Sequence, residues 1–338
     1  MAHIKIPKHN SGFYFLQTSL PSLAENKAMK KFTIAIHGGA GTLIKGKMTD
    51  EKEIAYKKAL EHALNSGYSI LENGGSAMNA VEEAVKRMED SPLFNAGKGS
   101  VFTAAGTHEM DASIMDGNNL KAGAVTTVTG IQNPISLAKD VMKHTEHVFL
   151  AGDGAIEFAK SIGYEIKDPS YFHDELRYQQ WQQLKDTDNF QLDHSLKKDS
   201  KFGTVGAVAL DQDGNIAAAT STGGMTNKRF GRVGDSPMIG AGTYANNKTC
   251  AVSCTGSGEY FIRGVIAYDV SALMEYKGLS LEEAASEVVM KRLLEIGGDG
   301  GLIAVDIHGN ITMPFNTEGM YRGMMSSDGV LEISIYKN

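Results

Sequence analysis

The sequence predicts an α+β protein in which helices and strands come in blocks and do not alternate strictly. Short apolar runs typical of buried strands gather in residues 204–254 and again near the C-terminus. Apolar residues at helical spacing gather in residues 50–90 and 261–294. Glycine, at 38 of 338 residues, is about 11% against a usual ~7%, which indicates many tight turns. Blocks of this kind are typical of layered α+β folds.

Composition excludes several classes of protein. A chain of 338 residues can bury a sizeable core as one large or two ordinary domains. Its 33 Lys and Arg against 40 Asp and Glu give a net charge of −7, which argues against nucleic-acid and polybasic membrane surfaces. Two cysteines, Cys250 and Cys254, cannot make a disulfide framework, and we expect both to be small buried residues. No run of about 18 apolar residues is present, so we expect no membrane span.

Residues 1–30 are predicted to be a disordered extension, unless translation starts at Met29. The apolar stretch 13–20 is interrupted by Gln, Thr and Ser, which is not typical of a secretory signal. Removal of the first 28 residues is therefore expected to leave activity and maturation nearly unchanged. A cytoplasmic location is expected, while the extension leaves a periplasmic or secreted one open.

Between residues 31 and 166 the pattern predicts strands and helices in turn. Residues 31–37 form a buried strand that runs into a glycine loop at 38–41. Two helices start near Asp50 and Ser76, and each has one apolar face: Ile54, Leu60 and Leu64 in the first, and Ala77, Val81, Val85 and Met88 in the second. A glycine-rich loop follows at 92–99, then strands at 110–115 and 122–129, and helices after Asn133 and Asp153.

A polar segment at about 167–203 separates the two halves, and it contains Trp181 and a predicted short helix at 176–184. Strands are then expected at 204–210, 215–220, 238–244 and 250–254, helices at 261–275 and 281–294, and final strands that end at Tyr336. Residues 208–225 align without gaps on 303–320. This repeat indicates either two similar hairpins with Gly-Asn turns or a repeated strand–turn–strand unit.

Two glycine motifs resemble known sites but are incomplete. Residues 41–47 match most of a phosphate-binding loop, yet Met48 stands where a Ser or Thr hydroxyl should hold Mg²⁺. Residues 37–41 resemble an esterase oxyanion loop, but the sequence contains no Gly-x-Ser-x-Gly. Neither an NTPase nor an esterase is therefore predicted.

The bond between Gly203 and Thr204 is the most informative feature, because a polar segment ends there and a buried strand begins. Some hydrolases use an N-terminal Thr, whose own α-amine acts as base for its hydroxyl. An α-amine titrates near 7.7 to 8.0 and is partly neutral at working pH. Exposing it requires a cut at Gly203–Thr204, where Gly203 tolerates strained geometry that favours attack by the hydroxyl.

Downstream residues supply the other groups that such a hydrolase needs. Residues 220–224 place hydroxyls at a strand end before flexible backbone. Arg232 and Asp235 match the α-carboxylate and α-ammonium of an amino acid, although a surface ion pair is the alternative. Residues 253–258 offer hydroxyls and backbone N–H groups, as an oxyanion hole requires, or form a simple glycine turn.

Six ordered motifs make the chain similar to the isoaspartyl peptidase/L-asparaginase family, the plant-type branch of the N-terminal-nucleophile (Ntn) hydrolases. They lie at residues 32–41, 92–97, 203–206, 222–228, 231–237 and 254–259, and the resemblance extends from Phe32 to Tyr336. It implies a four-layer αββα sandwich made as a precursor. Self-cleavage would give an α chain, 31–203 after the extension, and a β chain, 204–338, as one domain. Two such pairs would form a dimer of heterodimers, a heterotetramer, with no nucleic-acid or membrane partner.

The same resemblance implies roles for individual residues. Thr204 would be the nucleophile and Thr222 would orient it, while Thr255 and the Gly256 amide would form the oxyanion hole. Arg232 and Asp235 would hold the substrate, which Gly224, Gly258 and Asn95 would also contact. The reaction needs no cofactor. A structural sodium ion would be bound by backbone carbonyls of Met88, Glu89, Ser91, Phe94, Ala96 and Lys98.

The substrates implied are β-aspartyl dipeptides and L-asparagine. Glycosylasparaginase is an alternative, but those enzymes typically carry His-Asp before the Thr, where this chain has Phe202 and Gly203. A second alternative is an uncleaved, inactive homologue that only binds amino acids. A free N-terminal Thr204 would distinguish an enzyme from that homologue.

Overall fold

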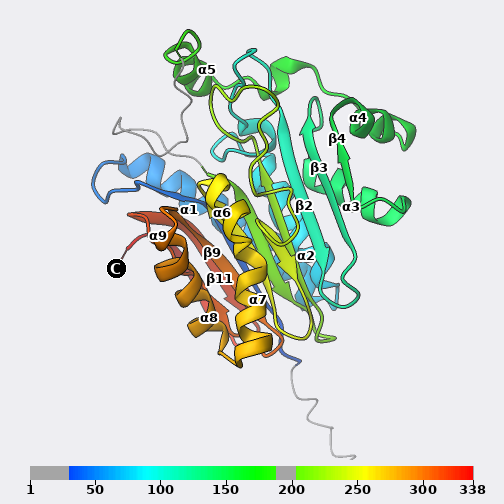
Figure 1. The fold of residues 1–338 in the computed structure, drawn as a ribbon, viewed down its shortest axis with the longest axis vertical. Helices are drawn as coiled ribbons and strands as arrows, with labels where there is room; N and C mark the ends of the chain where they lie inside the picture. The colour runs from blue at the N-terminus through cyan, green and yellow to red at the C-terminus, as the bar shows by residue number, and fades with distance from the viewer. Residues whose placement is uncertain (1–29, 188–202, 338) are drawn as a thin grey trace, which may run out of the picture.

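The computed structural model describes residues 30–187 and 203–337, which form two β-sheets with helices packed against them (Figure 1). This arrangement confirms the α+β prediction. The predicted extension up to residue 29 and residues 188–202 of the predicted linker lie outside the described residues. Among the described helices, none is long and apolar enough to cross a membrane.

The larger sheet has eight strands, all antiparallel to their neighbours except the pair β3 and β4. In spatial order they are β12 (Leu331–Tyr336), β11 (Gly319–Ser326), β1 (Thr33–Gly41), β5 (Val205–Leu210), β6 (Ile216–Thr222), β2 (Met110–Asp116), β3 (Ala122–Val128) and β4 (Phe149–Ala151). Strand β5, which follows the Gly203–Thr204 bond, lies between β1 and β6 in the middle of the sheet. The strand that starts at the candidate nucleophile is therefore held on both sides.

The smaller sheet is antiparallel and comes entirely from the chain after residue 204. Its order is β10 (Ile311–Thr312), β9 (Gly300–Asp306), β8 (Cys250–Gly256) and β7 (Thr243–Ala245). Apolar side chains of β1, β5 and β6 pack against those of β8 and β9 in one cluster that includes Val208, Ala218, Ala251 and Ile303. The two sheets therefore face each other.

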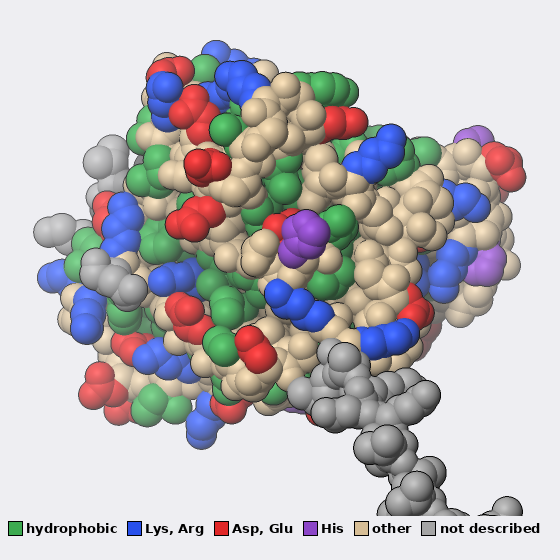
Figure 2. Space-filling model, turned by 90° about the horizontal axis from the view of Figure 1, so that it is seen from below, with side chains coloured by type: hydrophobic (Ala, Val, Ile, Leu, Met, Phe, Trp, Pro, Cys, Tyr) green, Lys and Arg blue, Asp and Glu red, His purple; other side chains and the backbone are tan. Residues whose placement is uncertain are grey.

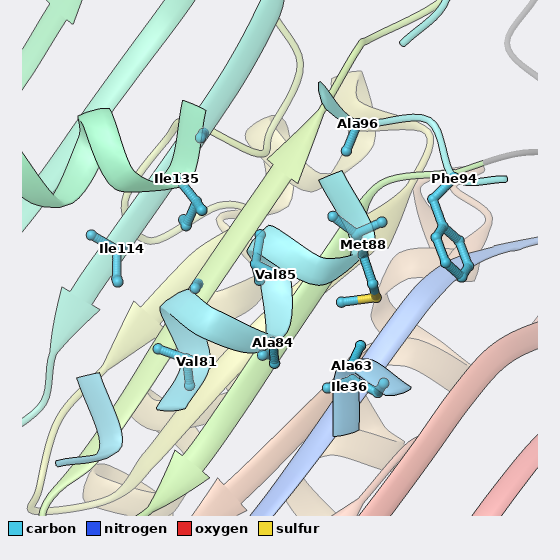
Figure 3. Close-up of a cluster of buried hydrophobic side chains, with 14 of the residues drawn as sticks. Ile36, Ala63, Val81, Ala84, Val85, Met88, Phe94, Ala96, Ile114 and Ile135 are labelled. Carbon is cyan, nitrogen blue, oxygen red and sulfur yellow. The ribbon is translucent and has the colours of Figure 1, made fainter. Parts of the chain in front are cut away.

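The outer face of the larger sheet is covered by α1 (Asp50–Glu72), α2 (Ala77–Glu89) and α3 (Pro134–His144). Figure 3 shows Val81, Ala84, Val85 and Met88 of α2 beside the strands. The predicted apolar face of α2 is fully buried, and Ser76 caps the helix by accepting a hydrogen bond from the Asn79 N–H, as its position predicted.

The remaining helices are α4 (Gly152–Ser161), α5 (Glu175–Gln182), α6 (Gly258–Gly264), α7 (Ile266–Lys277), α8 (Leu281–Glu287) and α9 (Leu293–Glu295). Helices α7 and α8 bury an apolar face against the smaller sheet, where both free cysteines are also buried, as expected. Helix α5 is the short helix predicted within the polar segment at 167–203, and Trp181 on it stacks on Phe102 with ring centroids 5.6 Å apart.

Some predicted element boundaries were wrong. The glycines at 38–41 continue β1, with a bulge between His37 and Gly39, because they pair with β11. The helix predicted to start near Asp50 is capped by Thr49, which accepts from the Lys52 N–H, and Ile54, predicted on its apolar face, is 52% exposed.

Two further elements differ from prediction near the candidate site. Of the strand expected at 238–244, only its end forms β7, because successive turns occupy the earlier residues. The helix expected at 261–275 is broken at Val265, which has a φ of 48°. The N–H groups of Ala267 and Tyr268 donate to the carbonyls of Ala241 and Gly240, so α7 starts anew against that loop.

The internal repeat forms two similar hairpin turns. One carboxylate oxygen of Asp211 accepts from the N–H groups of Asp213 and Asn215, and Asp306 does the same for residues 308 and 310. This supports the hairpin interpretation. Asp211 also accepts from the Ala77 N–H, so this turn holds the N-terminus of α2.

Candidate active site

The backbone around the Gly203–Thr204 bond is tightly enclosed. A Cβ atom on Gly203 would lie 2.8 Å from the Cα of Gly39 and 2.9 Å from the Oγ1 of Thr255. A Cβ on Gly39, which has a φ of +111°, would lie 2.6 Å from the Cα of Gly203. Because neither position has room for a side chain, both glycines are required for this close approach.

Thr204 is buried at the start of β5 and is held from two directions. Its Oγ1 lies 3.3 Å from the Oγ of Ser236, and its carbonyl lies 3.0 Å from the Nδ1 of His37. Sequence reasoning did not name either partner as a site residue. Both stand inside motifs that carried the family resemblance, but neither motif indicated that its residue contacts Thr204.

Thr222, Gly224 and Asn95 lie close together beside the start of β5. Val205 pairs with Ser221, so the same register places Thr204 opposite Thr222 at the end of β6. The Oγ1 of Thr222 accepts from the Gly224 N–H at 3.1 Å, and the Asn95 Nδ2 donates to the Gly224 carbonyl at 2.7 Å. The structure therefore brings these three predicted residues together.

Thr255 lies on the other side of the Gly203–Thr204 bond, at the end of β8. It is fully buried, and its Oγ1 lies 3.4 Å from the Ala40 N–H as well as close to Gly203. Gly256 follows with a φ of 157°, and a Cβ there would collide with the Asp299 carbonyl. Of the pair predicted to stabilise an oxyanion, Thr255 thus lies against Gly203, and Gly256 is the next residue along the chain.

Arg232 and Asp235 converge on Gly258 without pairing with each other. A Cβ on Gly258 would lie 3.0 Å from the Arg232 Nη2 and 3.0 Å from the Asp235 Oδ1. Arg232 instead makes a two-pronged contact with Glu259, with Nε–Oε1 and Nη2–Oε2 distances of 2.9 Å. The surface-ion-pair alternative for Arg232 and Asp235 is therefore wrong. Glu259 was missed by sequence reasoning, although it closes the last family motif.

Asp235 is a buried carboxyl with unused hydrogen-bonding capacity. Its Oδ2 has no hydrogen-bond partner among the described residues. Burial, partly offset by hydrogen bonding and by the Arg232 charge, raises the pKa of Asp235 to about 7. A cationic ligand group at this position would satisfy Oδ2 and favour the ionised carboxylate.

The side chain of Lys228 is buried next to Gly224. The Lys228 side chain is 1% exposed; its Nζ donates to the Glu109 carbonyl at 2.8 Å and lies 4.0 Å from the Asp111 Oδ2. A Cβ on Gly224 would lie 3.0 Å from this Nζ. Lys228 was not predicted as a site residue, because a lysine at the end of a glycine-rich turn carries no signal of burial.

The residues predicted to bind sodium lie at the end of α2 and in the loop after it. They are Met88, Glu89, Ser91, Phe94, Ala96 and Lys98. The carbonyls of Glu89 and Phe94 face the turn at 97–99, where a Cβ on Gly97 or Gly99 would collide with them. In residues 30–187 and 203–337, no group of three or more His, Cys, Asp and Glu could hold a metal ion. Sodium bound here would therefore depend on carbonyl oxygens.

Comparison with known proteins adds independent evidence. Residues 30–335 match the family model described as asparaginase. The chain is 53% identical over 312 residues to the isoaspartyl peptidase of Escherichia coli strain K12, covering 91% of this chain and 97% of that protein. It is 42% identical to a probable isoaspartyl peptidase/L-asparaginase 2 of Arabidopsis thaliana, covering 91% and 100%. It is 41% identical to a plant-type L-asparaginase of Pyrococcus abyssi, covering 86% and 95%.

Proposed function

This chain belongs to the asparaginase family, and from that premise we propose that it is an amide hydrolase that removes β-linked aspartyl groups from dipeptides and converts L-asparagine to aspartate and ammonia. The observation that carries the proposal is the enclosure of Gly203–Thr204. The Thr204 hydroxyl, just before a central strand, lies 3.3 Å from the Ser236 Oγ, and the Thr255 hydroxyl lies against Gly203 on the other residue of the bond.

Self-cleavage creates the nucleophile. The Thr204 hydroxyl attacks the Gly203 carbonyl carbon, the C–N bond breaks, and the nitrogen takes up a proton as it becomes the α-amine of Thr204. Water then hydrolyses the ester that joins Gly203 to the Thr204 oxygen. The new amine titrates near 7.7 to 8.0 and can act as base for its own hydroxyl. Because β1 pairs with β5 and β11, and β2 pairs with β6, strands from both sides of the cut remain neighbours in one sheet and the two chains stay together.

Substrate turnover uses the same atoms. Arg232 binds the α-carboxylate of the aspartyl group, and Asp235 binds its α-ammonium. Thr204 attacks the β-carbonyl, whose oxygen receives hydrogen bonds from the Thr255 hydroxyl and the Gly256 amide. Thr222 orients the nucleophile, while Gly224, Gly258 and Asn95 complete the wall of the pocket. The C–N bond of the substrate then breaks, and the leaving ammonia or amino acid takes up the proton that the Thr204 hydroxyl gave to the α-amine. Water hydrolyses the remaining ester with Thr204 and releases aspartate.

The rest of the family architecture belongs to the same proposal. Helices on the outer faces and two facing sheets support the four-layer αββα sandwich of the Ntn hydrolases. Carbonyls around Gly97 and Gly99 support a structural sodium ion, and the reaction itself uses no cofactor. A dimer of αβ heterodimers and a cytoplasmic location complete the proposal.

Intact mass spectrometry combined with two substrates tests this function. After incubation at neutral pH, we expect the chain to separate into residues up to 203 and residues 204–338. The cleaved protein should hydrolyse β-aspartyl-leucine and L-asparagine. A stable 36.3 kDa chain without turnover would support the inactive homologue, and preference for a glycosylated asparagine would support glycosylasparaginase.

A further inference from the structure

His37 lies in β1 as a fully buried imidazole between two polar partners. Its Nδ1 is 3.0 Å from the Thr204 carbonyl and its Nε2 is 3.0 Å from the Ser253 Oγ. A carbonyl oxygen only accepts, so Nδ1 carries the proton. Burial lowers the pKa of His37 to about 3, although the bond to Thr204 opposes this, so the ring is neutral near pH 7. Nε2 is then an acceptor, and Ser253 donates to it.

This tautomer sets the direction of a chain of buried hydroxyls. The Ser253 Oγ lies 2.7 Å from the Thr220 Oγ1, and the Ser253 proton already points to His37. The Thr220 proton therefore serves Ser253, with the Gly242 carbonyl as a second, longer acceptor at 3.2 Å, and Thr243 donates to Thr220 at 2.5 Å. Each hydroxyl has a single proton, so Ser253, whose proton is used by His37, can only accept from Thr220.

The chain returns to the nucleophile at its other end. The Ser113 hydroxyl donates to the Ser236 carbonyl at 2.6 Å and shares the same proton with the Thr243 Oγ1 at 2.8 Å. The hydroxyl of that same Ser236 is the side-chain partner of Thr204. Both the carbonyl and the hydroxyl of Thr204 are therefore held by one connected, buried network.

Gly206 provides the space for the bond between His37 and Ser253. A Cβ on Gly206 would collide with both the Ser253 Oγ and the His37 Nε2. The φ of Gly206 is not among the positive values, so its backbone does not demand glycine. The room needed by the two side chains is therefore what excludes a larger residue at this position.

We propose that His37 is a positioning residue for the nucleophile, a neutral imidazole that anchors the Thr204 carbonyl and ends the hydroxyl chain. The inference rests on the proposed function, in which Thr204 is the nucleophile. The anchored carbonyl belongs to the Thr204–Val205 peptide, which self-cleavage leaves intact. The same anchor therefore holds the Thr204 Cα before and after activation, while the nitrogen side of the residue is released.

Three substitutions separate the two bonds of His37. In His37→Asn, the amide nitrogen can replace Nδ1 and still reach the Thr204 carbonyl. In His37→Gln, the amide reaches toward Ser253 and the donor at the δ position is lost. Gly206→Ala pushes His37 and Ser253 apart. His62→Asn, on the exposed face of α1, is the matched control.

The readouts are the self-cleavage rate, kcat and KM for β-aspartyl-leucine. A misplacement of about 1 Å costs about 100-fold in rate. We therefore expect kcat and self-cleavage to fall about 100-fold in His37→Gln and Gly206→Ala, and less in His37→Asn. KM should change less than about 3-fold, because Arg232 and Asp235 are untouched. Wild-type rates in His37→Gln, or a loss confined to KM, would overturn the proposal.

Nitrogen NMR of the unsubstituted protein keeps the proposal testable if a variant fails to fold. We expect His37 to show a protonated Nδ1 and an unprotonated Nε2 from pH 5 to 8, also in the uncleaved Thr204→Ala variant, which retains the carbonyl. A proton on Nε2, or titration near 6.5, would overturn the inference about His37. Self-cleavage by Thr204→Ala would instead overturn the proposed function, so the two failures are distinguishable.

Discussion

The two halves of the candidate site differ in chemistry and in burial. Around Thr204 the contacting side chains, His37 and Ser236, are uncharged, buried and held by hydrogen bonds to the two sheets and their connections. Around the proposed substrate clamp, formed by Arg232 and Asp235, Arg232 makes an ion pair with Glu259, whose side chain is 50% exposed. One half fixes atoms in place, and the other presents charges to a ligand.

This contrast follows from what each half must do. Reacting atoms need fixed geometry, and a buried network in which each hydroxyl has a partner supplies it. Recognition of a zwitterion needs full charges, which are costly to bury without partners. Arg232 accordingly rests on Glu259 near solvent, while Asp235, the buried member, has its pKa raised to about 7 by burial. Charged side chains of both signs are also common on the surface, and Figure 2 shows Lys, Arg, Asp and Glu intermixed on one face.

Thr204→Ala should have the largest effect, because it removes the attacking hydroxyl from the fixed half. We expect a single uncleaved chain after long incubation at neutral pH and no measurable hydrolysis. Intact mass and the β-aspartyl-leucine assay check this. Thr204→Ser is the matched control, since it keeps the hydroxyl and should still cleave. A cleaved Thr204→Ala protein would show that the nucleophile lies elsewhere.

Among changes to the charged residues of the site, Arg232→Ala should cause the largest loss of kcat/KM. It leaves a substrate carboxylate unpaired, which costs about 2 to 5 kcal/mol, or roughly 30- to 5000-fold in kcat/KM. Arg232→Lys should recover only part of this loss, because an ammonium cannot form the two-pronged contact. Self-cleavage should be unaffected, since the clamp does not hold Gly203–Thr204.

Substrate variants test the same clamp without mutation. Dipeptides blocked at the α-carboxylate should be nearly inert to the wild-type enzyme. An ordinary α-linked aspartyl dipeptide should also fail, because its β-carboxylate is free and its scissile bond lies elsewhere. Similar kcat/KM for blocked and unblocked β-aspartyl substrates would contradict the assignment of Arg232 and Asp235.

The pH dependence of substrate binding should report Asp235. Its raised pKa of about 7 means that the free enzyme binds a proton there below pH 7 and must lose it to pair with an α-ammonium. KM should therefore rise as pH falls below 7, by up to about tenfold per pH unit. Asp235→Asn should have a high KM that no longer varies in this range.

The titration of Asp235 also makes the free energy of unfolding depend on pH: raising the pH improves substrate binding but lowers stability. An unfolded Asp loses its proton near 3.8, whereas the folded group keeps it to about 7. Between these values the folded state binds more protons, so the free energy of unfolding falls as pH rises, by up to about 1.4 kcal/mol per pH unit. Denaturant unfolding at pH 5 and 7 should show this slope, and Asp235→Asn should reduce it.

Glu259→Gln should have the smallest effect of the series. Exposed ion pairs contribute about 0 to 1 kcal/mol, so KM should change less than about 5-fold. KM should fall, because Arg232 no longer has to break its contact with the Glu259 carboxylate to bind the substrate. Unchanged self-cleavage serves as the internal control. A loss as large as that of Arg232→Ala would mean that Glu259 itself holds the substrate.

Local sequence signals predicted most of the elements and the position of the candidate nucleophile, and the resemblance to a family indicated the other site residues. The apolar spacing of α2 and its Ser76 cap act within a few residues, as does the change from polar segment to buried strand at Thr204. The groups predicted around the site, including Asn95, Thr255 and Gly258, do lie near it, because the motifs that indicated them are continuous.

The contacts that hold the nucleophile were decided only by the tertiary structure. His37 is 167 residues from Thr204 and 216 residues from Ser253 in the sequence. The three residues meet because β5 lies beside β1 and β8 faces both strands. A serine or a histidine carries no periodic signal of its partner, and a glycine such as Gly206 does not reveal which neighbours fill its space. Those facts depend on which strands become neighbours, and strand order is set by long-range packing that no local pattern encodes.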